Sequence, residues 1–391
     1  MKIKDIGRTV TGKTPSTKQK DNYGGGILFI TPEEVSNGYY VQKTERTLSD
    51  KGFESIKNNT LNGISVLVNC IGNIGDVAIV NGKCATNQQI NAITDFKNGI
   101  NPSYIYYKLQ QYKQVFNNLA GNTVLKILPK SIFDEVDIDI PDLKRQNAIS
   151  GILSCIDEII YNNNSINAEL DAMIKLIYDY WFLQFEFPNE DGKPYKSSGG
   201  KLVWNEELKK EIPEGWSIRK IQDYCNIFTG KKDVKQALEL GKYKFYSCSP
   251  EHKFSDEKLY EGKAVLISGN GSYTGRTIFV NDAFDLYQRT YACTNKYKKD
   301  YMEYIYYSML KFFVPKVSGG THGSAIPYIV YDDIAKQQIL INEQVVDKFI
   351  QKIKCSTDRI IGIKKENEEL IKLRDFLLPL LMNGQVGFKK M

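Results

Sequence analysis

At 391 residues, the chain is long enough for two or three domains that each bury a core of their own. Its net charge of +6 suits localised anion-binding faces, and also an ordinary basic protein, so charge alone leaves nucleic-acid binding open. No apolar run reaches the ~18 residues of a membrane span, and the first residues lack an apolar signal segment, so we expect a cytoplasmic protein.

Cysteine and histidine usage argues against several kinds of site. The seven cysteines are scattered without a Cys-x-x-Cys pair, which is typical of reduced thiols in the cytosol. The two histidines, His252 and His322, stand 70 residues apart. The sequence therefore predicts no metal site, no bound cofactor and no catalytic triad.

Residues 1–140 have the pattern of a mixed α/β domain with many short strands. Runs at 64–68 and 77–80 are rich in β-branched residues, and Asn-Gly turn signals stand at 37–38, 62–63 and 81–82. The aromatic-rich segment 102–116 predicts a short helix. We interpret 1–140 as the first domain.

A long helix is predicted from Lys144 to Gln184, within a helical region at 141–186. Its apolar residues follow the alternating three-four spacing of a heptad seam, at Ile149, Ile152, Ile156, Ile159, Ile166, Leu170, Met173, Ile177 and Tyr180. Asn163 occupies the one position that breaks this run. Because a helix of roughly 60 Å with one apolar stripe needs a partner, we expect a second helix to cover it.

The second half of the chain repeats this order. A polar, turn-rich linker at 187–211 leads to a second mixed α/β domain at 212–340, followed by a helical region at 341–391. The stripe of that second helix, 344–382, is interrupted by Pro379 and consists of Val346, Ile350, Ile353, Ile360, Leu370, Leu377 and Leu381. The expected fold is two similar α/β domains separated by two long antiparallel, coiled-coil-like helices.

An internal repeat supports the two-domain interpretation. The sequence Tyr-Ile-Tyr-Tyr at 104–107 returns unchanged at 304–307, and Gly75, Asn81 and Ala92 match glycine, asparagine and alanine 200 residues later. A period of this length has the size of a whole domain. Two similar domains suit a two-part target. The Tyr-Ile-Tyr-Tyr aromatics could stack on bases, but at helical spacing they favour core packing.

Three local motifs suggest enzymes that the surrounding sequence does not support. The segment 7–14 fits the P-loop pattern G-x4-G-K-[ST], but no apolar helix follows it, and the repeat retains only Thr-Gly-Lys, at 229–231. Asn-Pro-Ser-Tyr at 101–104 is one letter from an amino-methyltransferase motif, but favours a proline-initiated helix start. Pro-Asp-Leu-Lys at 141–144 lacks the carboxylate context of a nuclease and favours a helix start.

Three phrases together resemble one protein family. They are Trp-Phe-Leu-Gln-Phe-Glu-Phe-Pro at 181–188, Ile-Pro-Glu-Gly-Trp at 212–216 and Leu-Leu-Pro-Leu-Leu-Met-Asn-Gly at 377–384. In this order, over nearly the whole chain, they resemble the specificity (S) subunit of type I restriction-modification systems. The first domain lacks a Pro-x-Gly-Trp phrase of its own.

The resemblance implies a DNA-reading scaffold without catalysis of its own. It implies that each target-recognition domain reads one half of an asymmetric, bipartite site in double-stranded DNA. The conserved helices would set the gap between the halves and dock two methyltransferase subunits, which motor-nuclease subunits join. S-adenosylmethionine would belong to those partners.

Candidate DNA contacts are polar and basic residues in matching loops of the two copies, because lysine and arginine hold phosphates while arginine, asparagine and glutamine reach base edges. In the first domain they are Lys13, Asn73, Asn87, Gln88, Gln89, Asn122 and Lys126. In the second they are Lys231, Lys232, Asn270, Arg276, Arg289, His322 and Ser324. For partner docking we expect exposed aromatics at the end of the first long helix, namely Trp181, Phe182 and Phe185.

Two alternatives belong to other functional classes. The first is an enzyme, either a P-loop NTPase or a single-chain DNA methyltransferase, which would bind nucleotide or S-adenosylmethionine tightly by itself. The second is a stand-alone DNA-binding regulator, whose long helices would recruit no partner subunits.

Overall fold

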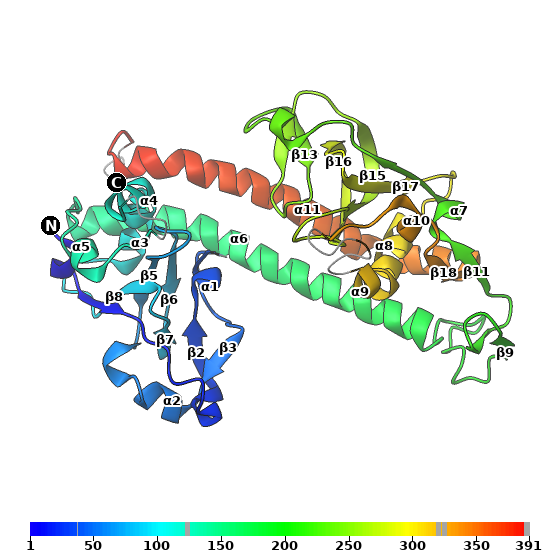
Figure 1. Ribbon diagram of the computed structural model, residues 1–391, viewed down its shortest axis with the longest axis horizontal. Coiled ribbons are helices and arrows are strands. Elements are labelled where there is room, and N and C mark those ends of the chain that lie inside the picture. The colour runs from blue at the N-terminus through cyan, green and yellow to red at the C-terminus, as the bar shows by residue number, and fades with distance from the viewer. Residues whose placement is uncertain (37, 122–125, 318–321, 323–326, 387–391) are drawn as a thin grey trace. The chain divides into compact units, whose positions relative to one another are not determined.

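The computed structural model describes residues 1–36, 38–121, 126–317, 322 and 327–386. The chain forms two compact units, and each unit contains segments from both long helices. Unit 1 comprises residues 1–165 and 365–391, and unit 2 comprises residues 166–364. Both are mixed α/β structures, as expected (Figure 1).

Unit 1 consists of short strands followed by helices. Its strands are β1 (Arg8–Thr11), β2 (Tyr23–Ile30), β3 (Arg46–Leu48), β4 (Thr60–Leu61), β5 (Ser65–Asn69), β6 (Val77–Val80), β7 (Cys84–Thr86) and β8 (Ile90–Thr94). Its short helices are α1 (Pro32–Ser36), α2 (Asp50–Glu54), α3 (Pro102–Gln110), α4 (Lys113–Leu119) and α5 (Lys130–Asp134). Three 3-10 turns are η1 (Ile3–Asp5), η2 (Lys20–Asn22) and η3 (Lys57–Asn59).

These strands form two four-stranded sheets, ordered β1-β8-β5-β6 and β3-β2-β7-β4. Strand β5 is buried on both faces: Val66 and Val68 join a cluster that includes the α3 tyrosines, whereas Leu67 joins a second cluster. Because successive side chains of a strand point to opposite faces, this explains why the run is continuously apolar.

Unit 2 has one larger sheet, ordered β12-β17-β15-β16-β13-β14, and two two-stranded sheets, β11-β18 and β10-β9. Its strands are β9 (Leu202–Asn205), β10 (Lys210–Pro213), β11 (Ser217–Lys220), β12 (Cys225–Thr229), β13 (Tyr243–Tyr246), β14 (Lys253–Ser255), β15 (Tyr260–Ser268), β16 (Thr277–Leu286), β17 (Thr290–Asn295) and β18 (Gln338–Ile341). Its short helices are α7 (Ile221–Tyr224), α8 (Met302–Phe312), α9 (Val314–Val317) and α10 (Tyr331–Ala335), with a 3-10 turn η5 (Val234–Gln236).

The two long helices are α6 (Leu143–Tyr178), which continues into a π-helical turn η4 (Asp179–Leu183), and α11 (Glu343–Met382). Both predicted helices are therefore confirmed. Pro379 does not interrupt α11, which continues past it to its last residue. The predicted helix at 102–116 is instead two helices, α3 and α4.

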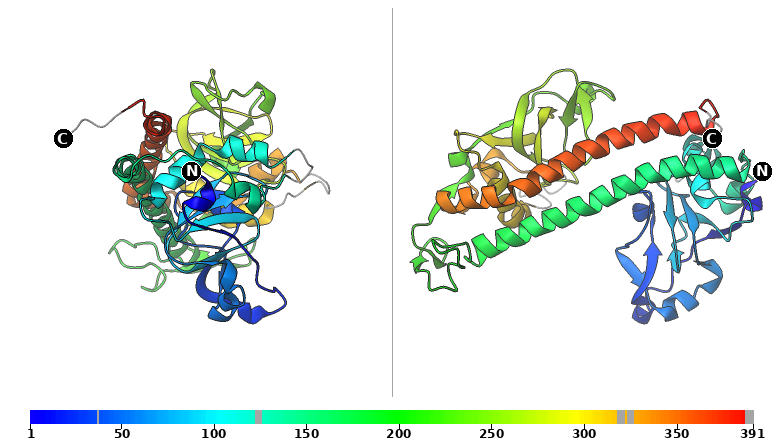
Figure 2. Two further views of the ribbon diagram at one scale, coloured as in Figure 1. Left: turned by 90° about the vertical axis from the view of Figure 1, so that its left-hand side faces the viewer. Right: turned by 180° about the vertical axis from the view of Figure 1, so that it is seen from behind.

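The helices pair antiparallel in each unit. In unit 1, Asp157 of α6 bonds Arg374 of α11 at 2.8 Å, and Asn163 bonds Asn367 at 2.9 Å, so the numbers rise on one helix as they fall on the other. Figures 1 and 2 show the end of α11, in red, beside the beginning of α6 in this unit. In unit 2, the ring of Tyr178 lies 6.0 Å from that of Phe349.

Only part of the apolar seam predicted for α6 is buried in the structure. Ile149, Ile156 and Asn163 are buried as expected. Five other residues of the predicted seam, which are spaced seven apart, are 39–42% exposed: Ile152, Ile159, Ile166, Met173 and Tyr180. Leu153 and Ile174 are buried instead. Positions i+3 and i+4 lie on neighbouring parts of a helix face, so the sequence could not decide which faces the partner.

Two of the enzyme-like motifs have plain structural explanations. Strand β1 lies inside the P-loop-like segment and pairs with β8, so this segment is not a phosphate-binding loop between a strand and a helix. Asn101 caps α3 by accepting a hydrogen bond from the Tyr104 amide at 3.1 Å, with Pro102 at the first helical position. Within the described part of the chain, no helix is long and apolar enough to cross a membrane.

Candidate nucleic-acid interface

In unit 1, several connections between strands meet at one edge of the domain. The Gly12 amide donates to the carbonyl of Ile90 at 3.1 Å. The Cys70 amide donates to the Gln89 carbonyl at 2.8 Å, and the Cys70 carbonyl accepts from the Leu128 amide at 2.9 Å. The connections joined in this way are 12–14, 70–76, 87–89 and 126–128.

Unit 2 repeats the two bonds of Cys70 between equivalent residues, and a different bond joins its remaining loops. The Gly269 amide donates to the Arg289 carbonyl at 2.9 Å, and the Gly269 carbonyl accepts from the Ile329 amide at 2.9 Å. The Gln288 amide donates to the Lys232 carbonyl at 2.9 Å. The loops joined here are 230–232, 269–276, 287–289 and 327–329. We call these two groups the loop clusters of unit 1 and unit 2.

The repeated Thr-Gly-Lys requires its glycine for close packing. A Cβ on Gly12 would lie 2.2 Å from the carbonyl oxygen of Asn87, and one on Gly230 would lie 1.8 Å from that of Leu286. No larger side chain fits there. The glycine backbone is therefore packed against the neighbouring segment in each copy, and the next residue is an exposed lysine: Lys13 and Lys231.

The other predicted residues of unit 1 lie in its loop cluster, apart from Asn122, which is outside the described residues. Asn73, Gln88 and Lys126 are exposed. Asn87 and Gln89 are half-buried, and Asn87 stabilises the turn by accepting from the Gln89 amide and donating to its side chain, both at 3.0 Å. The structure thus brings six of the seven predicted residues together.

In unit 2 the predicted residues divide into exposed and engaged groups. Arg289 is exposed, and in the described part of the chain its guanidinium has no ion-pair partner. His322 stacks on Tyr328 with ring centroids 5.3 Å apart, and its Nε2 lies 3.3 Å from Asp333. Asn270 is half-buried, and its side-chain oxygen accepts from the Cys248 thiol at 3.2 Å. Ser324 lies outside the described residues.

Two of the cations predicted to contact DNA are bonded to other residues of unit 2. The Lys232 ammonium lies 2.7 Å from Asp285 and 2.9 Å from Glu257, and the bond to Asp285 is the main cause that raises its pKa. The Arg276 guanidinium donates to the carbonyls of Ser249 and Pro250, both at 3.3 Å, and burial lowers its pKa. These two side chains are therefore better placed to shape the loops than to contact DNA.

The expectation of exposed aromatics at the end of the first helix was wrong. Trp181, Phe182 and Phe185 are only 8%, 4% and 5% exposed. The rings of Phe182 and Phe185 both lie 5.7 Å from that of Trp216, and Trp181 lies 6.0 Å from Phe349. The sequence placed these rings correctly at a helix end, but the second domain of the same chain covers them.

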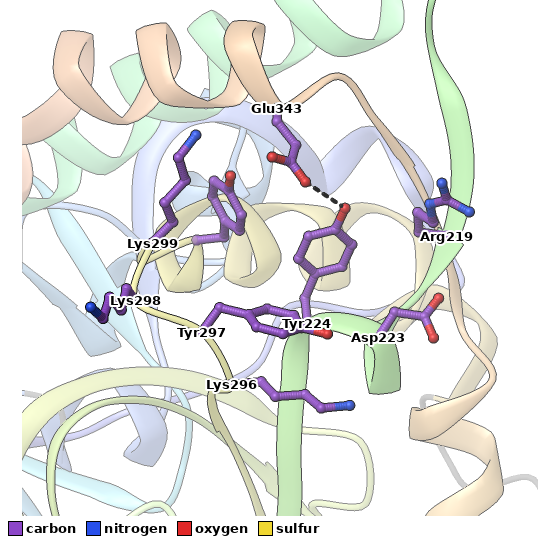
Figure 3. Close-up of a pocket in the computed structure, with 9 residues that line it drawn as sticks. Arg219, Asp223, Tyr224, Lys296, Tyr297, Lys298, Lys299 and Glu343 are labelled. Atoms are coloured by element: carbon purple, nitrogen blue, oxygen red, sulfur yellow. Dashed lines mark hydrogen bonds between the residues drawn. The ribbon is translucent and has the colours of Figure 1, made fainter.

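A cavity of about 690 Å³ in unit 2 lies away from the loop cluster (Figure 3). Its lining consists of Arg219, Asp223, Tyr224, Lys296, Tyr297, Lys298, Lys299, Tyr301 and Glu343. Several of its charged groups are engaged: Glu343 accepts from the Tyr224 hydroxyl at 3.3 Å, and Lys299 pairs with Asp347 at 2.9 Å. The cavity lies at the end of β17 that is opposite to loop 287–289, roughly 17 Å from that loop along the strand.

Sequence comparison agrees with this duplicated architecture. The chain matches the family model of the type I restriction modification DNA specificity domain at residues 1–172 and again at 213–373. It is 28% identical over 415 residues to the type I restriction enzyme MjaIX specificity subunit of Methanocaldococcus jannaschii, covering 100% of this chain and 94% of that protein. It is also 28% identical over 190 residues to the EcoDI specificity subunit of Escherichia coli, covering 45% of this chain and 40% of that protein.

The fold also matches a solved structure. The crystal structure of the type I restriction-modification S subunit from M. genitalium aligns with a TM-score of 0.58 and 16% identity. The alignment covers 100% of this chain and 96% of that one. At this identity the match supports the fold.

Proposed function

Because the chain belongs to the family of type I restriction-modification DNA specificity domains, we propose that its two loop clusters read the two halves of a bipartite DNA site. The chain is a specificity subunit, and the chemistry of methylation and cleavage belongs to other subunits. It works in the cytoplasm, where the DNA that it reads is accessible.

The observation that carries this proposal is that the two domains share a backbone arrangement but have different side chains at one equivalent position. Gln89 and Arg289 occupy equivalent positions, because the carbonyl of each accepts a bond from the same strand connection, at Cys70 in one copy and Gly269 in the other. Glutamine suits a bidentate contact to adenine and arginine suits guanine. The same backbone arrangement therefore places a different base-contacting side chain in each domain, as two different half-sites require.

Lysines 13 and 231 have a different role in this proposal. They occupy the same place in both copies, so they cannot distinguish one half-site from the other. An exposed lysine fixed by a packed glycine suits a phosphate, which is present in every sequence. We assign Lys13 and Lys231 to backbone contacts that set the register of each domain on the duplex.

The docking surface for methyltransferase subunits is better assigned to the exposed side of α6 than to the buried aromatics. In unit 1 this side carries Ile152 and Ile159. In unit 2 it carries Ile166, Met173 and Leu176 and continues into η4 with Tyr180, and Leu176 is 70% exposed. Apolar side chains repeated along one helix face are costly in water and mark a protein contact. Motor-nuclease subunits would then join the complex of methyltransferase and specificity subunits.

DNA reading is tested by sequencing methylated DNA from cells that carry the intact system. We expect a methylated motif with two specified parts, and replacement of residues 87–89 should change only one part. The proposal fails if no methylated motif depends on this chain, or if that replacement changes both parts equally.

Docking is tested by co-purification of the methyltransferase subunit with Leu176→Glu or Ile159→Glu. A charge at the centre of an apolar contact should abolish or strongly weaken the complex. The matched control is Leu240→Glu, because Leu240 is 84% exposed in unit 2 and lies outside both long helices. Unchanged complexes with both helix variants would remove this surface from the proposal.

A further inference from the structure

The connection that leads from a sheet to the aromatic-rich helix differs between the two units. In unit 1 the Lys97 amide donates to the Ile6 carbonyl at 2.9 Å, and in unit 2 the Lys296 amide donates to the Tyr224 carbonyl at 3.0 Å. The two connections therefore leave their strands in the same way. Helix α3 begins five residues after Lys97, whereas α8 begins six residues after Lys296. The connection of unit 2 is thus one residue longer.

Each connection is bonded to a long helix, but in a different manner. In unit 1 the side chain of Gln146 on α6 donates to the Gly99 carbonyl at 2.9 Å and accepts from the Asn101 amide at 2.8 Å. In unit 2 the bond to α11 is made by the side chain of Lys299, whose ammonium lies 2.9 Å from Asp347. The cavity of about 690 Å³ lies beside this longer connection. It therefore accompanies a part of unit 2 that departs from the repeat.

Three tyrosines line this cavity. The rings of Tyr297 and Tyr301 lie 6.3 and 5.6 Å from that of Tyr224, both in edge-to-face contact. The equivalents of Tyr224 and Tyr301 in unit 1 are Ile6 and Asn101, so this aromatic lining is not shared by the two copies. Tyr224 and Tyr301 are buried, whereas Tyr297 is 56% exposed. One aromatic ring is therefore accessible to a ligand.

The charged residues of the lining are mostly cations. Four cations stand against two carboxylates, Asp223 and Glu343. Figure 3 shows Lys298 on one side of the labelled tyrosines and Arg219 on the other. Neither Lys296 nor Lys298 has an ion-pair partner among the residues that the structure describes. The cavity therefore favours an anionic ligand.

The exposed ring and the cations lie close together. The Lys296 ammonium is 5.9 Å from the ring centroid of Tyr297. An exposed tyrosine ring suits stacking on a planar base, and a lysine ammonium suits a phosphate. A ligand that contains both groups uses the whole lining, whereas an inorganic anion uses only the cations. The volume is within the roughly 300–1,000 Å³ of small-molecule sites.

We infer that this cavity binds a nucleoside monophosphate, with the base on Tyr297 and the phosphate on Lys296 and Lys298. The site is at the opposite end of β17 from the reading loop 287–289, so its ligand is a small molecule and not the duplex that the loops contact. The inference is independent of the proposed function, because it requires no contact between the loop clusters and DNA.

The test is titration calorimetry of AMP, adenosine and inorganic phosphate against the full chain alone, because methyltransferase subunits would bring a nucleoside-binding site of their own. We expect AMP to bind more tightly than either of the other two probes. Tyr297→Ala should weaken AMP binding by about 10-fold, and Tyr297→Phe, which retains the ring, should bind AMP as the wild type does. Lys298→Gln should weaken the binding of AMP but not that of adenosine.

Matched controls are Tyr273→Ala and Lys235→Gln, which change an exposed tyrosine and an exposed lysine of unit 2 outside the cavity. Both should bind AMP normally. The inference is overturned if millimolar AMP does not bind, or if inorganic phosphate binds as tightly as AMP, since the ring then contributes nothing. Unchanged AMP affinity of Tyr297→Ala would also overturn it.

Discussion

The central hairpin differs between the two domains although its sequence is related. In unit 2, β15 and β16 form one continuous antiparallel pair in which Gly262 faces Asp282. In unit 1 the equivalent residues form four short strands, interrupted at Gly63 and Gly82, whose φ angles are +78° and +108°. The Gly82 amide donates to the Gly63 carbonyl at 3.3 Å, so the two interruptions lie opposite each other in the hairpin. One six-stranded sheet thus corresponds to two four-stranded sheets.

This difference shows which part of the domain is constrained. The order of strands is retained, since β1-β8-β5-β6 followed by β7-β2-β3 corresponds to the single order of unit 2. The bonds between reading loops are also retained, at Gln89 in one copy and Arg289 in the other. Continuity of the sheet is therefore dispensable, whereas the geometry at the edge that carries the loops is not.

A second difference concerns how each domain is attached to the long helices. The Tyr107 hydroxyl donates to Asp157 at 2.6 Å, and Asp157, with a side chain only 2% exposed, pairs with Arg374 at 2.8 Å. In unit 2 the Tyr307 hydroxyl donates to Asp171 at 3.1 Å, and Asp171 pairs with Lys175 on its own helix. The same repeated tyrosine is thus part of a buried network in one unit and of a half-exposed one in the other.

The largest expected effect separates these two networks. Arg374→Ala leaves a buried carboxylate without its cation and should lower the unfolding free energy of unit 1 by ~3–5 kcal/mol. Lys175→Ala removes an exposed pair and should cost unit 2 less than ~1 kcal/mol. Hydrogen exchange resolved by residue, with urea unfolding, measures both. Equal losses in the two units would contradict the contrast.

A smaller effect is expected at the paired readers. Arg289→Ala should relax specificity at one half-site by ~1–3 kcal/mol if its guanidinium contacts guanine in a bidentate manner. Gln89→Ala should do the same at the other half-site only. Binding of the assembled complex to single-base variants of the motif provides the measurement. Sequence-independent losses would remove both residues from the base readers.

The broken hairpin predicts an effect of about 1 kcal/mol. Gly82→Ala places a Cβ at a left-handed φ and should destabilise unit 1 by ~1 kcal/mol or slightly more. Asp282→Ala, at the equivalent place in the continuous hairpin, removes a half-buried ion pair with Lys244 at 3.1 Å and should still cost unit 2 less than Gly82→Ala costs unit 1. Thermal unfolding of the two variants tests this, and a tolerated alanine at 82 would show that the break has another cause.

The smallest expected effect distinguishes phosphate contacts from base contacts. Lys13→Ala and Lys231→Ala should each weaken binding to all sequences alike and reduce the slope of log affinity against log salt by about 0.9. The methylated motif should stay unchanged. Titrations at several salt concentrations measure the slope. A change of motif in either variant would make that lysine a base reader.

Sequence patterns were sufficient for the existence of the two long helices and for the internal repeat. The long helices follow from sustained apolar spacing, and the role of the repeated tyrosines follows from their helical spacing: Tyr104, Tyr107 and Tyr304 are at most 1% exposed. The duplicated Thr-Gly-Lys marked a shared position of the two copies, and in the structure its glycine packs closely against backbone atoms at both Gly12 and Gly230.

What the sequence could not supply was the covering of particular side chains. Trp181 is buried because its ring packs on Phe349, in a cluster that also contains Trp216, and both of these residues are far from it in the sequence. Lys232 is engaged because Asp285 stands on another strand.

The last turns of α11 have a consequence for how the protein is made. Leu381 and Met382 belong to the same buried cluster as Ile3, Ile6 and Ile149, so the core of unit 1 contains residues from η1 and from the end of α11. During synthesis unit 1 can therefore be completed only after all of unit 2 has been made. A frameshift or stop codon near residue 370 would spare the second domain and damage the reader in unit 1.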